Sequence, residues 1–134
     1  MTVGILIVAH EKVGSALVEA ATITLGFCPL EVIVQSIHRD CEPDKQINDA
    51  QSYVEQLNSG DGVLVITDIF GSTPSNIACA MKKMTYVEVV SGVNLPMLIR
   101  IFNYPRLNLE ELVEKAISGG REGIMDCKIH FSAK

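Results

Sequence analysis

The chain has 134 residues, 48% of them hydrophobic and 20% charged, which is typical of one folded domain. Sixteen acidic against eleven basic side chains give a formal net charge of −5, and this disfavours nucleic acid as a partner because phosphate binding needs a basic surface. The apolar runs are far shorter than the roughly 20 residues of a membrane span, no basic segment precedes the first run, and the four cysteines form no CxxC pair. We therefore expect a cytoplasmic protein without membrane insertion, with reduced thiols and no zinc site.

The first half of the chain alternates apolar runs with helical patterns. The continuous run Val3–Ala9 predicts a strand buried on both faces, and apolar residues at helical spacing predict a helix over residues 14–26. The run Glu31–Ile37 predicts a second strand. Pro43 is favourable in a first helical turn, and the helix that it begins is expected to end at the polar, glycine-containing segment 58–62.

The same alternation continues in the second half. Residues 62–68 predict a third buried strand, residues 74–84 a helix capped by Ser72 or Thr73, and residues 86–90 a fourth strand. Three further elements follow: a short helix over 95–102, a helix that begins after the capping box of Asn108 and Glu111 and ends at Gly119–Gly120, and a last strand over 127–132.

Buried strands that alternate with helices indicate an α/β fold with an open, doubly wound, mainly parallel sheet and helices on both faces. Ligand sites in such sheets lie beyond the carboxyl ends of the strands, near the point where the strand order reverses. His10 ends the first predicted strand and Asp68 ends the third. We therefore expect these two side chains to meet at one edge of the sheet.

A histidine and an aspartate in contact suit nucleophilic chemistry. A histidine nucleophile needs one unprotonated ring nitrogen, and a carboxylate that accepts the proton of the other nitrogen fixes that tautomer. We interpret His10 as the reactive group and Asp68 as the acceptor that orients it through Nδ1, which leaves Nε2 to attack. The alternative is a loop histidine that only caps a turn.

The segment after the third strand has the features of an anion site. Gly71 allows close approach of the backbone, and Ser72 and Thr73 offer hydroxyl groups at the start of a helix, where free N–H groups favour an anion. These three residues are candidates for binding a phosphoryl group, although the segment taken alone is better explained by an ordinary capped helix after a tight turn. His38 lies in a polar loop and is expected to be solvated, and no pair of ligands has the spacing of a metal site.

Three segments carry a resemblance to a known family: residues 5–10 (ILIVAH), 67–76 (TDIFGSTPSN) and 91–98 (SGVNLPML). Together they resemble the mannose-type enzyme IIA components of the bacterial phosphoenolpyruvate-dependent sugar phosphotransferase system (PTS). The resemblance covers essentially the whole chain. It implies a single IIA domain over residues 1–134, with no IIB domain attached.

The resemblance also implies a function. His10 would accept a phosphoryl group from the phosphocarrier protein HPr and pass it to a IIB component for sugar uptake and phosphorylation, so the chain would be a phosphotransferase that needs no cofactor or metal. Asp68 and Ser72 match the aspartate and serine near the phosphorylated histidine in the family. Its members are cytoplasmic homodimers that exchange the C-terminal strand, which here corresponds to residues 127–132.

Three other functions remain open at this point. A stand-alone IIA domain can act as a regulator whose phosphorylation controls binding to a partner protein. The phosphotransferase subunit of a dihydroxyacetone kinase has a similar fold and histidine. A receiver domain also places an aspartate after its third strand, but it needs an acidic pair at the first strand end, where this chain has His10 and Glu11.

Overall fold

The computed structural model describes residues 2–128, which form a four-stranded sheet with helices on both faces. All strand pairs are parallel, and the strand order is β2-β1-β3-β4. The strands are β1 (Gly4–His10), β2 (Val32–Ile37), β3 (Val63–Thr67) and β4 (Val87–Val90). The helices are α1 (Val13–Leu25), α2 (Pro43–Leu57), α3 (Thr73–Ala80), α4 (Leu95–Phe102) and α5 (Leu109–Glu122), with a 3₁₀ turn, η1 (Met81–Lys83), after α3.

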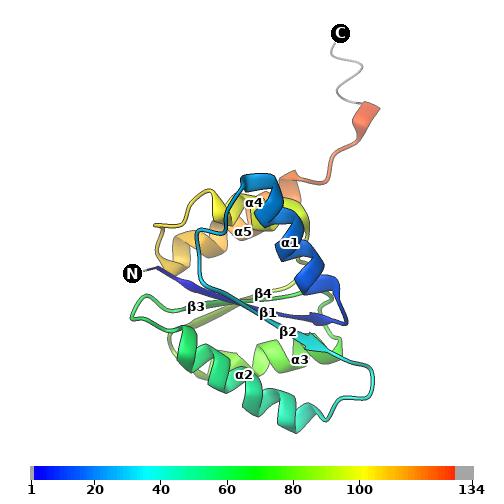
Figure 1. Cartoon of the computed structure of the whole chain (residues 1–134), viewed down its shortest axis with the longest axis vertical. Helices are drawn as coiled ribbons and strands as arrows, with labels where there is room; N and C mark the ends of the chain where they lie inside the picture. Colours follow the sequence, from blue (N-terminus) through cyan, green and yellow to red (C-terminus); the bar gives the residue numbers. More distant parts are fainter. Residues whose placement is uncertain (1, 129–134) are drawn as a thin grey trace.

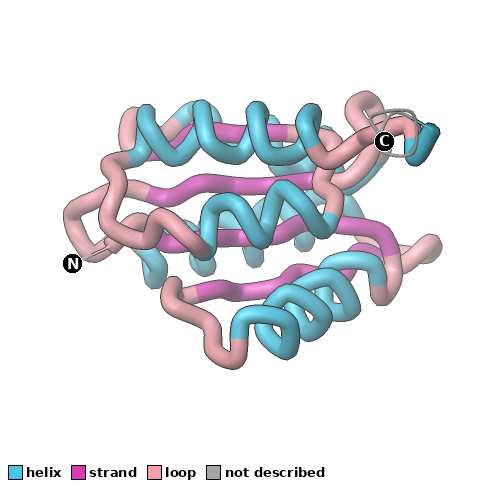
Figure 2. The backbone as a smooth tube through the Cα atoms, turned by 90° about the horizontal axis from the view of Figure 1, so that it is seen from above, coloured by secondary structure: helices cyan, strands magenta, loops and turns pink. Residues whose placement is uncertain are grey.

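Two helical layers enclose the sheet, which confirms the predicted open, doubly wound α/β fold. Helices α1, α4 and α5 cover one face, and α2 and α3 cover the other (Figure 1). Seen from above, the strands run side by side beneath the helices of the upper layer (Figure 2). Because both faces are covered, β1 and β3 read as continuous apolar runs instead of alternating patterns.

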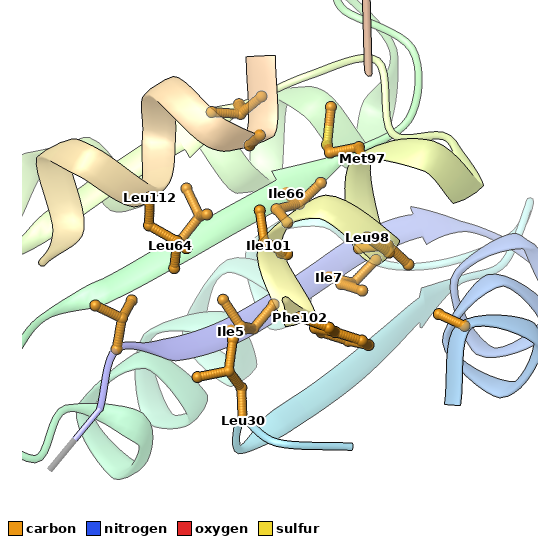
Figure 3. Close-up of a cluster of buried hydrophobic side chains, with 14 of the residues drawn as sticks. Ile5, Ile7, Leu30, Leu64, Ile66, Met97, Leu98, Ile101, Phe102 and Leu112 are labelled. Atoms are coloured by element: carbon orange, nitrogen blue, oxygen red, sulfur yellow. The ribbon is translucent and has the colours of Figure 1, made fainter. Parts of the chain in front are cut away.

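Alternate side chains of the central strands enter two separate cores. Ile5 and Ile7 of β1 pack with Leu64 of β3 under α1, α4 and α5, where Figure 3 shows them beside the side chains of α4. Leu6 and Val8 point to the opposite face and pack with residues of α2 and α3. The two-residue period of a strand thus fixes the orientation of β1, and with it the position of its last residue, His10.

The strand order reverses between β1 and β3. The chain passes from β1 outward to β2 on one side, then crosses back to β3 on the other side of β1. Since α1 follows β1 and α3 follows β3 on opposite faces of the sheet (Figure 1), the two helices diverge at the carboxyl ends of these strands. This is the place where doubly wound sheets hold ligands.

Three sequence predictions of element boundaries need correction. Helix α3 ends at Ala80, and residues 81–83 continue as a 3₁₀ turn. Helix α5 does not end at Gly119–Gly120 but continues to Glu122, because both glycines are buried against α4 and serve packing instead of termination. Cys127 and Lys128 of the predicted last strand are helical, and the rest of that strand, 129–132, lies outside the described residues.

No helix within residues 2–128 is both long enough and apolar enough to cross a bilayer.

Candidate functional site

His10 and Asp68 meet at the switch point of the sheet. His10 is the last residue of β1, in register with Ile37 of β2, and Asp68 follows the last residue of β3 directly. Because β1 and β3 are parallel neighbours, their carboxyl ends lie at the same edge. The His10 side chain remains 42% exposed, whereas that of Asp68 is only 11% exposed.

Asp68 holds His10 through two atoms of the histidine. The backbone N–H of His10 donates to Oδ2 of Asp68 at 2.8 Å, and the ring Nδ1 of His10 lies 2.8 Å from the same oxygen. The other oxygen, Oδ1, accepts the backbone N–H of Ile69 at 2.8 Å. The carboxylate is therefore fixed at both oxygens, and the imidazole is fixed at its Nδ1 edge.

This geometry determines the charge state of the aspartate. Burial opposes ionisation of Asp68, but the hydrogen bonds from the backbone and ring of His10 and from the backbone of Ile69 outweigh it, so the pKa of Asp68 lies below its ordinary value. An ionised carboxylate accepts hydrogen bonds only, so Nδ1 of His10 carries the proton in the contact. In neutral His10 the lone pair is then on Nε2, and this edge of the half-exposed ring is the one that can attack.

The loop after β4 also contributes to the backbone of the site. The N–H of Gly92 donates to the carbonyl of Asp68 at 2.8 Å, and the N–H of Val93 donates to the carbonyl of Thr67 at 3.1 Å. Gly92 makes this contact with φ of 86°, a conformation that favours glycine. The position of Asp68 is thus fixed from both neighbouring strands.

The predicted anion-binding residues lie at the start of α3 and use part of their hydrogen-bonding capacity internally. Gly71 adopts φ of 91°, and its N–H donates to Oγ of Ser75 at 3.1 Å. The hydroxyl of Ser72 donates to the carbonyl of Ile69 at 2.6 Å, so Ser72 occupies the N-cap position without a side-chain cap bond. Thr73, the first residue of the helix, lines the same depression as His10.

His10 opens into a depression of about 490 Å³ between the ends of β1 and β2 and the start of α3. Its walls include three residues to which the sequence analysis gave no role in the site: Glu11, Arg39 and Cys41. His38, expected to be solvated, is exposed but also lines this space. Its Nδ1 lies 2.7 Å from Oε2 of Glu11. The sequence signal for this contact is weak, because it depends on two loops that follow different strands.

The arrangement suits group transfer to a histidine nitrogen. It offers an oriented nucleophile, an ionised carboxylate to stabilise positive charge on the ring, and a helix N-terminus beside it. Within the described part of the chain, no three His, Cys, Asp or Glu side chains are grouped so that they could hold a metal ion.

Comparison with known proteins points to one family. Residues 4–117 match the family model described as the PTS system fructose IIA component. The PTS system mannose-specific EIIAB component of Escherichia coli (strain K12) is 28% identical over 131 residues, which are 96% of this chain. The chain spans about 40% of the length of that curated relative.

Solved structures share the fold over nearly the full chain. The phosphotransferase system component EIIA from Streptococcus agalactiae is 26% identical with a TM-score of 0.81, covering 98% of this chain and 99% of that one. The mannose/sorbose-specific IIA subunit from Enterococcus faecalis has a TM-score of 0.82 over 94% of this chain and 95% of its own, at 20% identity, which is a likeness of fold.

Proposed function

We propose that this chain, which belongs to the family of PTS system fructose IIA components, is a phosphohistidine relay protein. Members of the family carry phosphoryl groups in the sugar phosphotransferase system, and in this chain His10 would be the residue phosphorylated. In this proposal phospho-HPr is the donor and a IIB component is the acceptor. The single observation that supports the proposal best is the 2.8 Å contact between Nδ1 of His10 and Asp68, because it leaves Nε2 as the free nucleophile.

The transfer step follows from this geometry. The lone pair of His10 Nε2 attacks the phosphorus atom of the donor phosphohistidine, the P–N bond to the donor breaks, and a P–N bond to Nε2 forms. The electron pair of the broken bond returns to the donor imidazole. Positive charge that develops on the His10 ring is stabilised by Asp68 through Nδ1.

Phosphoryl transfer depends mainly on positioning and on stabilising negative charge. Helix α3 begins beside His10, and the N–H groups of its first turn have no partners within the helix. The N–H of Gly71 and the hydroxyl of Ser72 already donate hydrogen bonds within the loop. We therefore assign the direct contact with the phosphoryl group to the first turn of α3 at Thr73. Gly71 and Ser72 shape the loop that presents this turn.

The proposal also includes the location, the oligomeric state and the partners of the protein. We place the protein in the cytoplasm as a homodimer and treat residues 1–134 as a IIA domain that works with a IIB component. The net charge of −5 suits a donor with a basic docking surface. The regulatory alternative predicts that partner binding changes with phosphorylation while transfer to IIB is absent.

The decisive experiment is incubation with phosphoenolpyruvate, enzyme I and HPr, followed by intact-mass measurement and site mapping. We expect one acid-labile phosphoryl group on His10, its loss in His10→Ala, and full labelling in His130→Ala, the matched histidine control. Full labelling of His10→Ala would contradict the proposal. Addition of a IIB protein should then discharge the phosphorylated chain, and a lack of discharge would favour the regulatory role.

A further inference from the structure

A second imidazole–carboxylate pair lies beside the site. Glu11 follows His10 directly, and its Oε2 lies 2.7 Å from Nδ1 of His38, the residue after β2. The backbone N–H of Arg39 donates to the other carboxylate oxygen at 3.3 Å. All four residues line the same depression. The carboxylate of Glu11 is therefore a charged group in the wall of the space that receives the phosphoryl group in the proposed function.

The backbone at Glu11 is unusual. Among the described residues, Glu11 is the one non-glycine residue with a positive φ, 45°. For a residue with a Cβ atom this conformation is energetically unfavourable. The N–H of Glu11 nevertheless continues the ladder by donating to the carbonyl of Ile37 at 3.0 Å. The strained conformation thus accompanies a side chain that reaches the loop after β2.

The charges around the depression differ from those of the whole molecule. Besides His10, the charged side chains in its lining are Glu11, Arg39 and, when protonated, His38. Their formal sum is zero or +1, in a chain of net charge −5. A phosphoryl group on His10 brings up to two negative charges into this space. A carboxylate released from its partners would be free to approach and repel that group, whereas one held by the His38 ring and the Arg39 N–H keeps its position in the wall.

Glu11 and His10 also interact electrostatically. The pKa of Glu11 lies below its ordinary value, mainly because the His38 ring and then the backbone N–H of Arg39 are hydrogen-bonded to its carboxylate. Burial raises this pKa, and the charges of His38 and His10 lower it further. If the charge of His10 affects the carboxylate of Glu11, the charge of Glu11 equally affects the charge state of His10. The coupling is reciprocal by thermodynamic necessity.

We propose that Glu11 is an electrostatic positioning residue, whose carboxylate His38 and the backbone of Arg39 hold so that it opposes a phosphoryl group on His10 less than an unheld carboxylate would. The inference rests on the proposed function of His10. The pair sets the equilibrium of transfer between the donor and His10, not the capacity of His10 to be phosphorylated. Loss of His38 makes the phosphorylated state less favourable, and loss of the charge of Glu11 makes it more favourable.

The test is a measurement of the transfer equilibrium constant at fixed ratios of phospho-HPr to HPr, read by intact mass. We expect His38→Ala to lower this constant about three- to tenfold and Glu11→Gln to raise it by a similar factor, as a unit charge near a dianion at a solvated surface requires. In the double variant the effect of His38→Ala should disappear. His38→Gln, whose amide can still donate to Glu11, should restore most of the wild-type value.

The matched control is Glu88→Gln. Glu88 is half-exposed, and its carboxylate lies 2.8 Å from Nζ of Lys82, but it precedes the carboxyl end of β4 and does not line the depression. We expect no change in the equilibrium constant for this variant. Thermal unfolding of every variant verifies that folding is unchanged, which the exposure of Glu11 and His38 favours.

The possible failures are distinguishable. If saturating phosphoenolpyruvate, enzyme I and HPr do not label wild-type His10, the proposed function and this inference fall together. If labelling occurs but the constants of His38→Ala and Glu11→Gln equal the wild-type value, only the role of the pair is refuted. If His38→Ala lowers the constant equally in the Glu11→Gln background, His38 acts through its own charge, and the positioning of Glu11 is refuted.

Discussion

Both carboxylate oxygens of Asp68 accept N–H groups from the chain, and this property defines the chemistry of the residue. Oδ2 accepts the backbone N–H of His10 and faces its ring Nδ1, while Oδ1 accepts the N–H of Ile69. An amide has one acceptor end and one donor end. In either orientation it would turn an NH₂ group toward a backbone N–H.

We therefore expect Asp68→Asn to affect both function and stability. The substitution should slow phosphoryl transfer from phospho-HPr at least tenfold, because the ring loses its charged partner. It should also lower the free energy of unfolding by about 1 kcal/mol, because a backbone N–H loses its acceptor. Rapid-quench transfer assays and urea denaturation measure the two effects. Asp61→Asn, at an exposed aspartate before β3, is the control and should match wild type. Equal transfer rates for Asp68→Asn and wild type would exclude a role in orientation.

The stability of the protein should depend on pH through the same carboxylate. The pKa of Asp68 is lower in the folded chain than its ordinary value of about 4. Its ionised form therefore stabilises the fold above pH 4, and this contribution is lost as the pH falls through the folded-state pKa. We expect the difference in unfolding free energy between wild type and Asp68→Asn to narrow between pH 5 and pH 3. A constant difference over that range would contradict this prediction.

His10 and Asp68 could be located from the sequence because each comes at the carboxyl end of a predicted buried strand. In a doubly wound sheet, the carboxyl ends of parallel strands lie at the same edge. The sequence did not reveal the contact between Glu11 and His38. That contact requires Glu11 to adopt a left-handed conformation, which no pattern in a sequence indicates for a glutamate. The roles assigned to the site residues remain predictions until the labelling experiment is done.

At the scale of elements, the packing of helices against each other determined where a helix ends when the sequence signal was ambiguous. The repeat of apolar residues predicted strands β1–β4 and helices α1–α5 to within a few residues, and the capping box of Asn108 and Glu111 at the start of α5 is present. The pair Gly119–Gly120 was interpreted as a stop signal. In the structure a Cβ atom at Gly119 would lie 2.8 Å from Cγ of Arg100, so this glycine permits α5 to approach α4 closely.

This close approach predicts the effect of a substitution in α5. Alanine favours helices over glycine by about 1 kcal/mol, so an exposed Gly→Ala change in a helix would be stabilising. At Gly119 we expect the opposite, a loss of about 1–3 kcal/mol, because Arg100 and the backbone of Pro96 block the new methyl group. Urea denaturation measures it, with Glu114→Ala on the exposed side of α5 as the control. A more stable Gly119→Ala variant would show that the two helices can separate without cost.

At the scale of the whole molecule, β4 is an edge strand of the sheet, and within residues 2–128 no strand pairs with its outer edge. In residues 2–128, β4 pairs only with β3, and a groove of about 460 Å³ runs between its end and α5. Its apolar lining includes Val89 of β4, Ile117 of α5 and Ile124, which follows α5. An exposed strand edge with an apolar border is a natural surface for a second chain.

The proposed homodimer can be tested at this surface. Sedimentation equilibrium should give a mass near twice 14.6 kDa for wild type. Ile124→Glu should shift the mass toward the monomer, because it places a charge in the groove, where Ile124 is 78% exposed in the single chain. Ile23→Glu on α1, at a similarly exposed isoleucine outside the groove lining, should leave the mass unchanged. A monomeric wild type would refute the dimer.

The central position of β1 has a consequence for synthesis of the protein on the ribosome. Of the strands β1–β4, β1 emerges first, yet it needs a neighbour on each side, and the second neighbour, β3, begins only at Val63. Until then a nascent chain exposes one edge of a strand whose residues Ile5–Ala9 are entirely buried in the finished fold. Such an edge binds other unfolded chains readily. The order of the strands thus makes the first half of this protein the part that most needs a chaperone, and a translation product that stops near Leu57 should aggregate.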